Sequence, residues 1–158
     1  MLDHLKAHLR GKVVILGIGN ALRSDDGIGS LLASRLKARV PYIVYDAGVS
    51  PENFLGKIEK DKPENLVIID AVDFGGKPGE FRAVDSNDIK TANLFSTHNA
   101  SLSMLINFLQ SNSKMDIIVL IIQPKTITFG DQLSPEIKGA LVELESFFIQ
   151  SSIENEGK

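Results

Sequence analysis

The stretch Val13-Val-Ile-Leu-Gly-Ile-Gly-Asn-Ala-Leu-Arg-Ser-Asp-Asp-Gly-Ile-Gly29 decides the fold. An apolar run is broken by two closely spaced glycines, and a polar segment with two adjacent carboxylates, Asp25 and Asp26, follows. A helical pattern of apolar residues then begins. This order is typical of a buried strand, its carboxyl-end loop and the next helix in an α/β protein. Ligands of such folds bind outside the carboxyl ends of the strands, so we expect the chemistry in this loop.

The rest of the chain continues the alternation of strand and helix. Apolar runs predict strands over residues 12–18, 42–45, 65–69 and 116–122. One-sided apolar patterns predict helices that begin near Gly27, at Ser50-Pro51, after Asn99 and at Ser134-Pro135. A Gly-rich turn precedes residues 80–84, whose alternating pattern predicts an antiparallel edge strand.

These elements predict a single α/β domain over residues 1–158, built as three α/β/α layers. Its twisted, mostly parallel sheet has five strands, with an antiparallel edge strand and helices on both faces. Residues 1–11 form a leading segment with a brief helix, and residues 151–158 form a polar, frayed tail.

Composition excludes several classes of protein. The 158 residues suffice for one domain with a core, and their 43% hydrophobic and 23% charged content is ordinary for a globular protein. A net charge of -3 argues against binding nucleic acid through a basic surface. The lack of cysteine excludes disulfides, thiol catalysis and cysteine-ligated zinc. We find no signal peptide and no membrane-spanning run, so a cytoplasmic location is expected.

Carboxylates at strand ends are the first candidates for chemistry. Asp25 and Asp26 precede a helix, so either one is equally well explained as a helix cap or a solvated partner of the helix dipole. Asp70 follows four apolar residues at a strand end, where a charge without a partner is costly. Asp46 is a weaker candidate, and Asp73 is expected to be exposed.

A histidine at a helix start completes the candidate set. His98 precedes a one-sided helix, where the neutral imidazole that ligates metals is favoured, whereas His4 has no clear role. The ends of the elements that carry Asp26, Asp70 and His98 are expected to converge on one rim of the sheet. Two carboxylates and one imidazole form a mixed oxygen and nitrogen site for a divalent metal with open positions.

A dinucleotide-binding regulatory or redox module is the main alternative. Gly17 and Gly19 follow a strand, as in a dinucleotide fingerprint. The sixth position is Leu22, where that motif needs glycine or alanine, and the paired aspartates would repel a pyrophosphate. Glycines that allow a tight turn explain the same residues.

The motifs together resemble those of the hydrogenase maturation endopeptidases. The similarity spans about Lys12 to Phe148, in the family's order, and is strongest in the branch that processes hydrogen-evolving, energy-converting hydrogenases. It is carried by residues 17–29, Val49-Ser-Pro-Glu52, Val67-Ile-Ile-Asp-Ala-Val-Asp73, Pro78-Gly-Glu80, Ser96-Thr-His-Asn99 and Ile122-Gln-Pro124.

The resemblance implies a function and a site. The family removes the carboxyl-terminal extension of a nickel–iron hydrogenase large-subunit precursor after nickel insertion, and its metal-contacting residues fall on Asp26, Asp70 and His98. The nickel is then supplied by the substrate, with no organic cofactor, and hydrolysis uses either a metal-polarised water or a carboxylate base. A non-catalytic nickel chaperone is a further alternative. The expected partner is the precursor, with no nucleic acid and no membrane insertion.

Overall fold

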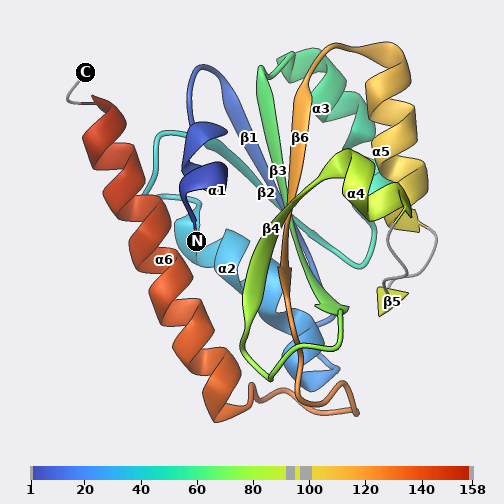
Figure 1. Ribbon diagram of the computed structural model, residues 1–158, viewed down its shortest axis with the longest axis vertical. Coiled ribbons are helices and arrows are strands. Elements are labelled where there is room, and N and C mark those ends of the chain that lie inside the picture. Colours follow the sequence, from blue (N-terminus) through green and yellow to red (C-terminus); the bar gives the residue numbers. More distant parts are fainter. Residues whose placement is uncertain (1, 92–94, 97–100, 157–158) are drawn as a thin grey trace.

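A mixed sheet forms the centre of the molecule in the computed structural model, which describes residues 2–91, 95–96 and 101–156 (Figure 1). Its strands follow the order β2-β1-β3-β6-β4, and β5 pairs with β3 outside this path. β4 is antiparallel to β6, whereas the other strands of the path are parallel. The strands are β1 (Val13–Ile18), β2 (Ile43–Gly48), β3 (Asn65–Asp73), β4 (Phe81–Asp85), β5 (Phe95–Ser96) and β6 (Asp116–Ile122). The predicted five-stranded sheet and its antiparallel edge strand are therefore confirmed.

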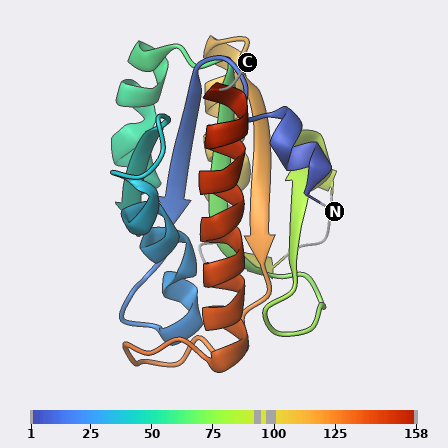
Figure 2. The same ribbon diagram turned by 90° about the vertical axis from the view of Figure 1, so that its left-hand side faces the viewer.

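Helices cover both faces of the sheet, as Figures 1 and 2 show. They are α1 (Asp3–Ala7), α2 (Ile28–Leu36), α3 (Leu55–Asp61), α4 (Ser86–Thr91), α5 (Ser101–Asn112) and α6 (Pro135–Glu156), with short 3₁₀ turns η1 (Ser24–Gly27) and η2 (Pro51–Phe54). The prediction that the chain frays from Ser151 is wrong, because α6 continues to Glu156 and buries Ser151 and Ser152.

Alternation along the strands creates two cores. Val13 and Ile15 face a cluster shared with α1, α2 and α6, whereas Val14 and Leu16 face a cluster shared with α3 and α5. Successive strand side chains point to opposite faces, so a continuous apolar run is needed where both faces are covered. This explains why the central strands contain almost no polar residue before their carboxyl ends.

Glycines allow α2 to approach the sheet closely. A Cβ atom added at Gly29 would lie 2.2 Å from the carbonyl oxygen of Ile18 and 2.6 Å from that of Ile69. One added at Gly17 would lie 2.2 Å from the carbonyl oxygen of Gly29. The helix therefore begins directly against the carboxyl ends of β1 and β3, and the glycines serve packing rather than a phosphate cradle.

Two local predictions differ from the structure. Ser50 makes no side-chain cap bond, and the helix expected after it is divided into η2 and α3, although Pro51 does occupy the start of the turn. The sequence did not indicate α4 or β5.

None of the helices in the described part of the chain has the length and apolar character that a membrane crossing requires.

Candidate functional site at the carboxyl edge of the sheet

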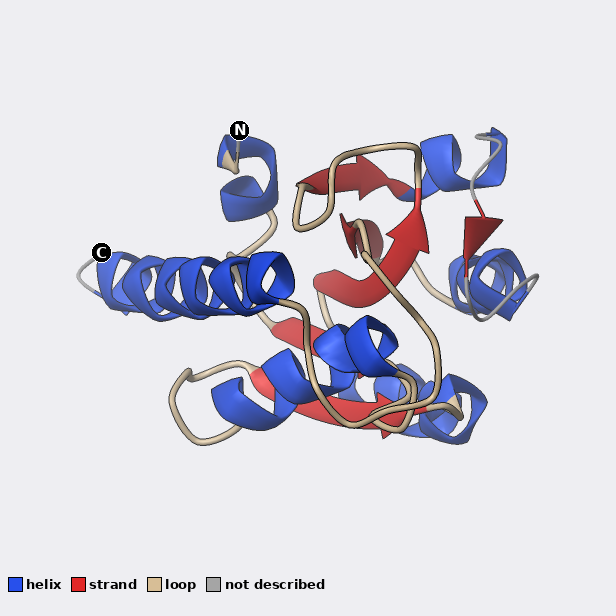
Figure 3. Cartoon of the chain, turned by 90° about the horizontal axis from the view of Figure 1, so that it is seen from below, coloured by secondary structure: helices blue, strands red, loops and turns tan. Residues whose placement is uncertain are grey.

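The loops after β1 and β6 meet at the carboxyl edge, which Figure 3 shows from below. Asp25, in the turn η1 after β1, is fully buried. Its Oδ2 accepts hydrogen bonds from the backbone N–H groups of Lys125 and Thr126, both at 3.0 Å, and from the Ser134 hydroxyl at 2.8 Å. Its Oδ1 accepts the Ser134 backbone N–H at 2.7 Å. Asp25 is therefore the residue that fastens the loop after β6 to the loop after β1, not a solvated helix partner.

The neighbouring residue holds the same loop through a strained backbone. Ser24 has a φ of 54°, in the left-handed region that side chains rarely adopt. Its backbone N–H donates to the Gly130 carbonyl at 2.8 Å, and its hydroxyl donates to the Thr128 carbonyl at 2.8 Å. Lys125, at the start of the loop, also pairs with Glu136 in α6. The hydrogen bond from Lys125 holds the pKa of the Glu136 carboxyl below its ordinary value.

Asp26 comes next in the turn and is also buried, with 3% of its surface exposed. Its Oδ2 accepts the Asn20 backbone N–H at 3.3 Å, and its carbonyl accepts the same N–H at 3.2 Å. A Cβ atom added at Gly19 would lie 2.5 Å from the Asp26 carbonyl oxygen. The loop therefore folds back tightly on Asp26, and a side chain at Gly19 would displace it.

Asp70 lies inside β3 rather than after it. The strand predicted over residues 65–69 continues to Asp73, so Asp70 lies within the strand and is fully buried. β1 pairs with β3 as far as Gly17 and Ile69, which sets Asp70 level with the end of β1. Both predicted carboxylates are thus buried at the carboxyl ends of neighbouring strands. Burial of two acids so close to the end of a sheet is typical of a functional site.

The third predicted residue, His98, lies outside the described residues. Within the described ranges no group of three histidines or carboxylates is arranged to hold a metal. Asp73 is exposed, as predicted. Asp46 is also exposed, and it accepts hydrogen bonds from the Ser30 hydroxyl at 2.5 Å and the Gly48 backbone N–H at 3.1 Å, which link it to α2 and to the end of β2.

Gln123 is a structural residue of this edge that sequence reasoning noted only as part of a motif. Its Oε1 accepts the backbone N–H groups of Phe74 at 2.9 Å and Gly76 at 3.1 Å, and its Nε2 donates to Asp73 at 3.1 Å. The side chain therefore fixes the Gly-rich turn between β3 and β4. The sequence feature that could have indicated this role is a single polar residue directly after the apolar strand β6.

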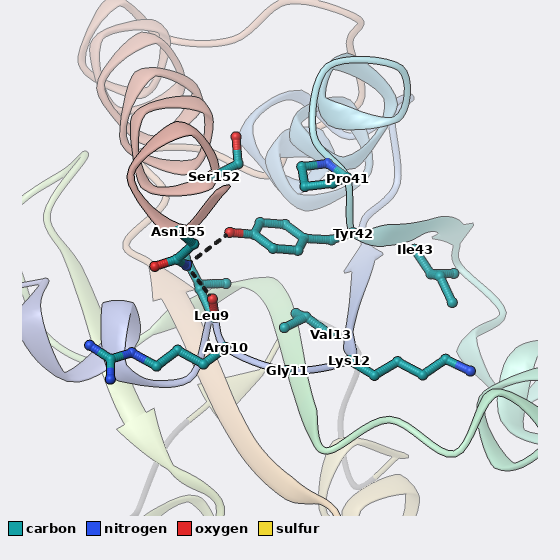
Figure 4. Close-up of a pocket in the computed structure, with 10 residues that line it drawn as sticks. All are labelled: Leu9, Arg10, Gly11, Lys12, Val13, Pro41, Tyr42, Ile43, Ser152 and Asn155. Carbon is teal, nitrogen blue, oxygen red and sulfur yellow. Dashed lines mark hydrogen bonds between the residues drawn. The ribbon is translucent and has the colours of Figure 1, made fainter. Parts of the chain in front are cut away.

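A cavity of about 600 Å³ lies at the opposite end of the sheet (Figure 4). Its lining includes Val13, Tyr42 and Asn155, and the Arg10 and Lys12 side chains extend away from it on either side. No carboxylate or histidine lines it. The cavity therefore lacks the groups of the predicted chemistry, which remain at the carboxyl edge.

The protein is thus a three-layer α/β protein with two buried acids at the carboxyl edge of its sheet. Comparisons then define the family. A family model described as hydrogenase maturation protease matches residues 27–151. The hydrogenase 3 maturation protease of Escherichia coli K12 is 38% identical over 130 residues, which cover 81% of this chain and 83% of that protein.

Solved structures agree with this assignment. The crystal structure of HycI, a nickel–iron hydrogenase maturation protease from Thermococcus kodakarensis, has a TM-score of 0.84 and 33% identity, and the match covers 94% of this chain and 98% of that one. The solution structure of the endopeptidase HycI from Escherichia coli has a TM-score of 0.78 and 35% identity, with 89% and 90% covered. The chain belongs to the hydrogenase maturation protease family and is therefore a hydrolase, as the resemblance in its motifs predicts. The dinucleotide-binding and chaperone alternatives are not favoured.

Proposed function

We propose that this chain is the endopeptidase that removes the carboxyl-terminal extension of a nickel–iron hydrogenase large-subunit precursor once nickel is inserted. In this proposal Asp26, Asp70 and His98 contact the nickel that the precursor carries. The observation that carries the proposal is the burial of two carboxylates, Asp26 and Asp70, at the ends of neighbouring strands in a chain of this family.

Chain connectivity supports the inclusion of His98. Ser96 in β5 pairs with Val72, which lies two residues beyond Asp70 in β3. His98 follows Ser96 by two residues, and two residues of chain span at most about 7 Å. The covalent reach of the chain therefore permits the His98 imidazole to approach the Asp70 carboxylate.

The chemistry of the three groups suits the substrate's metal. Carboxylate oxygens and a neutral imidazole are acceptable ligands for a borderline divalent ion such as nickel. Three protein ligands leave positions for the groups that hold nickel in the precursor. A precursor without nickel would leave the buried carboxylates without this ligand, so it would bind poorly and escape cleavage.

Asp26 can take part in hydrolysis in two ways. As a nickel ligand it helps to hold the metal that polarises the attacking water, whereas as a general base it removes a proton from that water. The two roles differ in kinetics. Asp26→Asn raises KM if the carboxylate acts chiefly in binding, and lowers kcat with KM retained if it acts as the base.

The test is cleavage of nickel-loaded precursor, followed by mass spectrometry of the large subunit. Wild-type protein should shorten the large subunit, and Asp70→Asn and His98→Ala should lose this activity while keeping wild-type circular dichroism. Asp46→Asn is the matched control, because Asp46 is an exposed aspartate at the carboxyl end of β2, and it should cleave normally. Intact precursor after incubation with the wild-type protein would refute the proposed function.

A further inference from the structure

Two large apolar side chains are exposed on the loops that surround Asp26. Leu22, in the loop after β1, is 60% exposed. Phe129, in the loop after β6, is 85% exposed, which is the highest value for a large apolar residue in the described part of the chain. Leu22 is also the residue whose size argued against a dinucleotide fingerprint, and the site described above gives it no role.

The backbones of these two residues are paired. Arg23 and Gly130 form a parallel β-bridge, and Leu22 and Phe129 directly precede them. The Gly130 N–H donates to the Leu22 carbonyl at 2.9 Å, and the Ser24 N–H donates to the Gly130 carbonyl at 2.8 Å. Leu22 and Phe129 therefore occupy equivalent positions on two hydrogen-bonded segments. We call these two residues the apolar platform.

The apolar platform is fixed relative to Asp26. The Arg23 guanidinium donates to the Ile127 carbonyl at 3.1 Å, and the Asp25 carboxylate holds both ends of the loop that carries Phe129. Asp26 is the next residue after Asp25 in the same turn. The loop therefore holds Phe129 in an exposed position on the segment paired with that of Leu22, and exposed apolar residues placed together beside a site offer a contact surface to another protein.

We propose that the apolar platform docks an apolar segment of the precursor polypeptide next to the bond that is cleaved. This inference rests on the proposed function and names the surface through which the protease recognises protein rather than metal. The occupant follows from continuity, because Leu22 lies four residues before Asp26 in the loop after β1, and Phe129 lies on the loop that Asp25 attaches to the turn of Asp26.

The proposed contact depends on the burial of apolar surface and needs no charged group on the precursor. Exposed aromatic and aliphatic anchors beside a site gain most of their binding free energy when a partner removes them from water. The platform would thus contribute affinity for any precursor, whether or not it carries nickel, whereas the buried carboxylates would distinguish the loaded form. The two contributions should be separable by mutation.

The experiment compares Leu22→Ser and Phe129→Ser with Val142→Ser and Ile153→Ser. The two control residues are each 57% exposed and lie on α6, away from the carboxylates. We expect Phe129→Ser to raise KM for nickel-loaded precursor by about tenfold or more, with kcat retained, and Leu22→Ser to act in the same direction. The control variants should keep the wild-type KM.

Binding measurements distinguish the possible failures. Calorimetric titration of the precursor gives a Kd for each variant whether or not cleavage occurs. Binding by wild type without cleavage, weakened by Phe129→Ser, would support the platform and refute the proposed function. Equal Kd values for wild type and Phe129→Ser would overturn the platform. Sedimentation that shows a wild-type dimer and a Phe129→Ser monomer would overturn it as well, by assigning this surface to a second copy of the chain.

Discussion

Replacing Asp25 with asparagine tests the attachment of the loop after β6 to the turn that carries Asp26. The substitution preserves the shape of the side chain but replaces one acceptor oxygen with an NH₂ group. In the better orientation the amide oxygen retains the three donors on Oδ2, and the NH₂ group then faces the Ser134 backbone N–H. A buried donor loses its acceptor as a result.

The size of the effect follows from this geometry. A hydrogen bond to a charged group contributes about 1.5–3 kcal/mol, and a buried donor left unpaired costs about 1–3 kcal/mol. We expect Asp25→Asn to lower the free energy of unfolding by about 2–3 kcal/mol. With a urea m-value of about 2 kcal/mol per molar, the midpoint should fall by about 1–1.5 M.

Urea denaturation followed by circular dichroism measures this change. Asp46→Asn is the matched control, since Asp46 also accepts hydrogen bonds from a serine hydroxyl and a backbone N–H but is exposed. Its unfolding free energy should change by under about 1 kcal/mol. If the Asp25→Asn and Asp46→Asn midpoints coincide, the buried carboxylate does not hold the loop and the reasoning is wrong.

Three further predictions concern stability and metal binding. Burial and the hydrogen bond to Asp61 raise the pKa of Tyr45 to about 12. The folded state favours the protonated phenol, so its stabilisation is complete below pH 10 and is lost as pH rises toward 12; Tyr45→Phe should flatten the pH dependence of unfolding there. Gly29→Ala should destabilise by about 3 kcal/mol, because its Cβ would strike backbone, whereas Gly139→Ala, in open space on α6, should stabilise by about 0.5–1 kcal/mol in thermal melts. Purified protein should lose added nickel on dialysis, because the three proposed ligands would form an incomplete site; stoichiometric retention would contradict this.

Sequence patterns predicted the helices and strands that are long enough to show a hydrophobic pattern within their own residues. The strand predicted over residues 116–122 matches β6 residue for residue, because a short run rich in isoleucine and valine suits a strand whose two faces are both covered. α4 and β5 were missed, since a six-residue helix and a two-residue strand are too short to show a period.

The candidate site depended on contacts that no local pattern reveals. Asp25 and Asp26 are adjacent and chemically identical, and helix-capping rules left both open. What distinguishes Asp25 is the segment 125–134, about 100 residues further along the chain, which donates four hydrogen bonds to its carboxylate. The position of Asp70 inside β3, rather than beyond it, likewise depends on pairing with β6 as far as Ala71 and Ile122.

The attachment of Asp25 to Ser134 also has a consequence for the order of folding. The two residues are 109 positions apart, so the ring they close is among the costliest in chain entropy and should form late. Its loss should then accelerate unfolding and leave the folding rate constant unchanged. A nascent chain that has not yet reached Ser134 cannot complete the turn beside Asp26. The loop arrangement around Asp26 is therefore completed only after Ser134 has been synthesised.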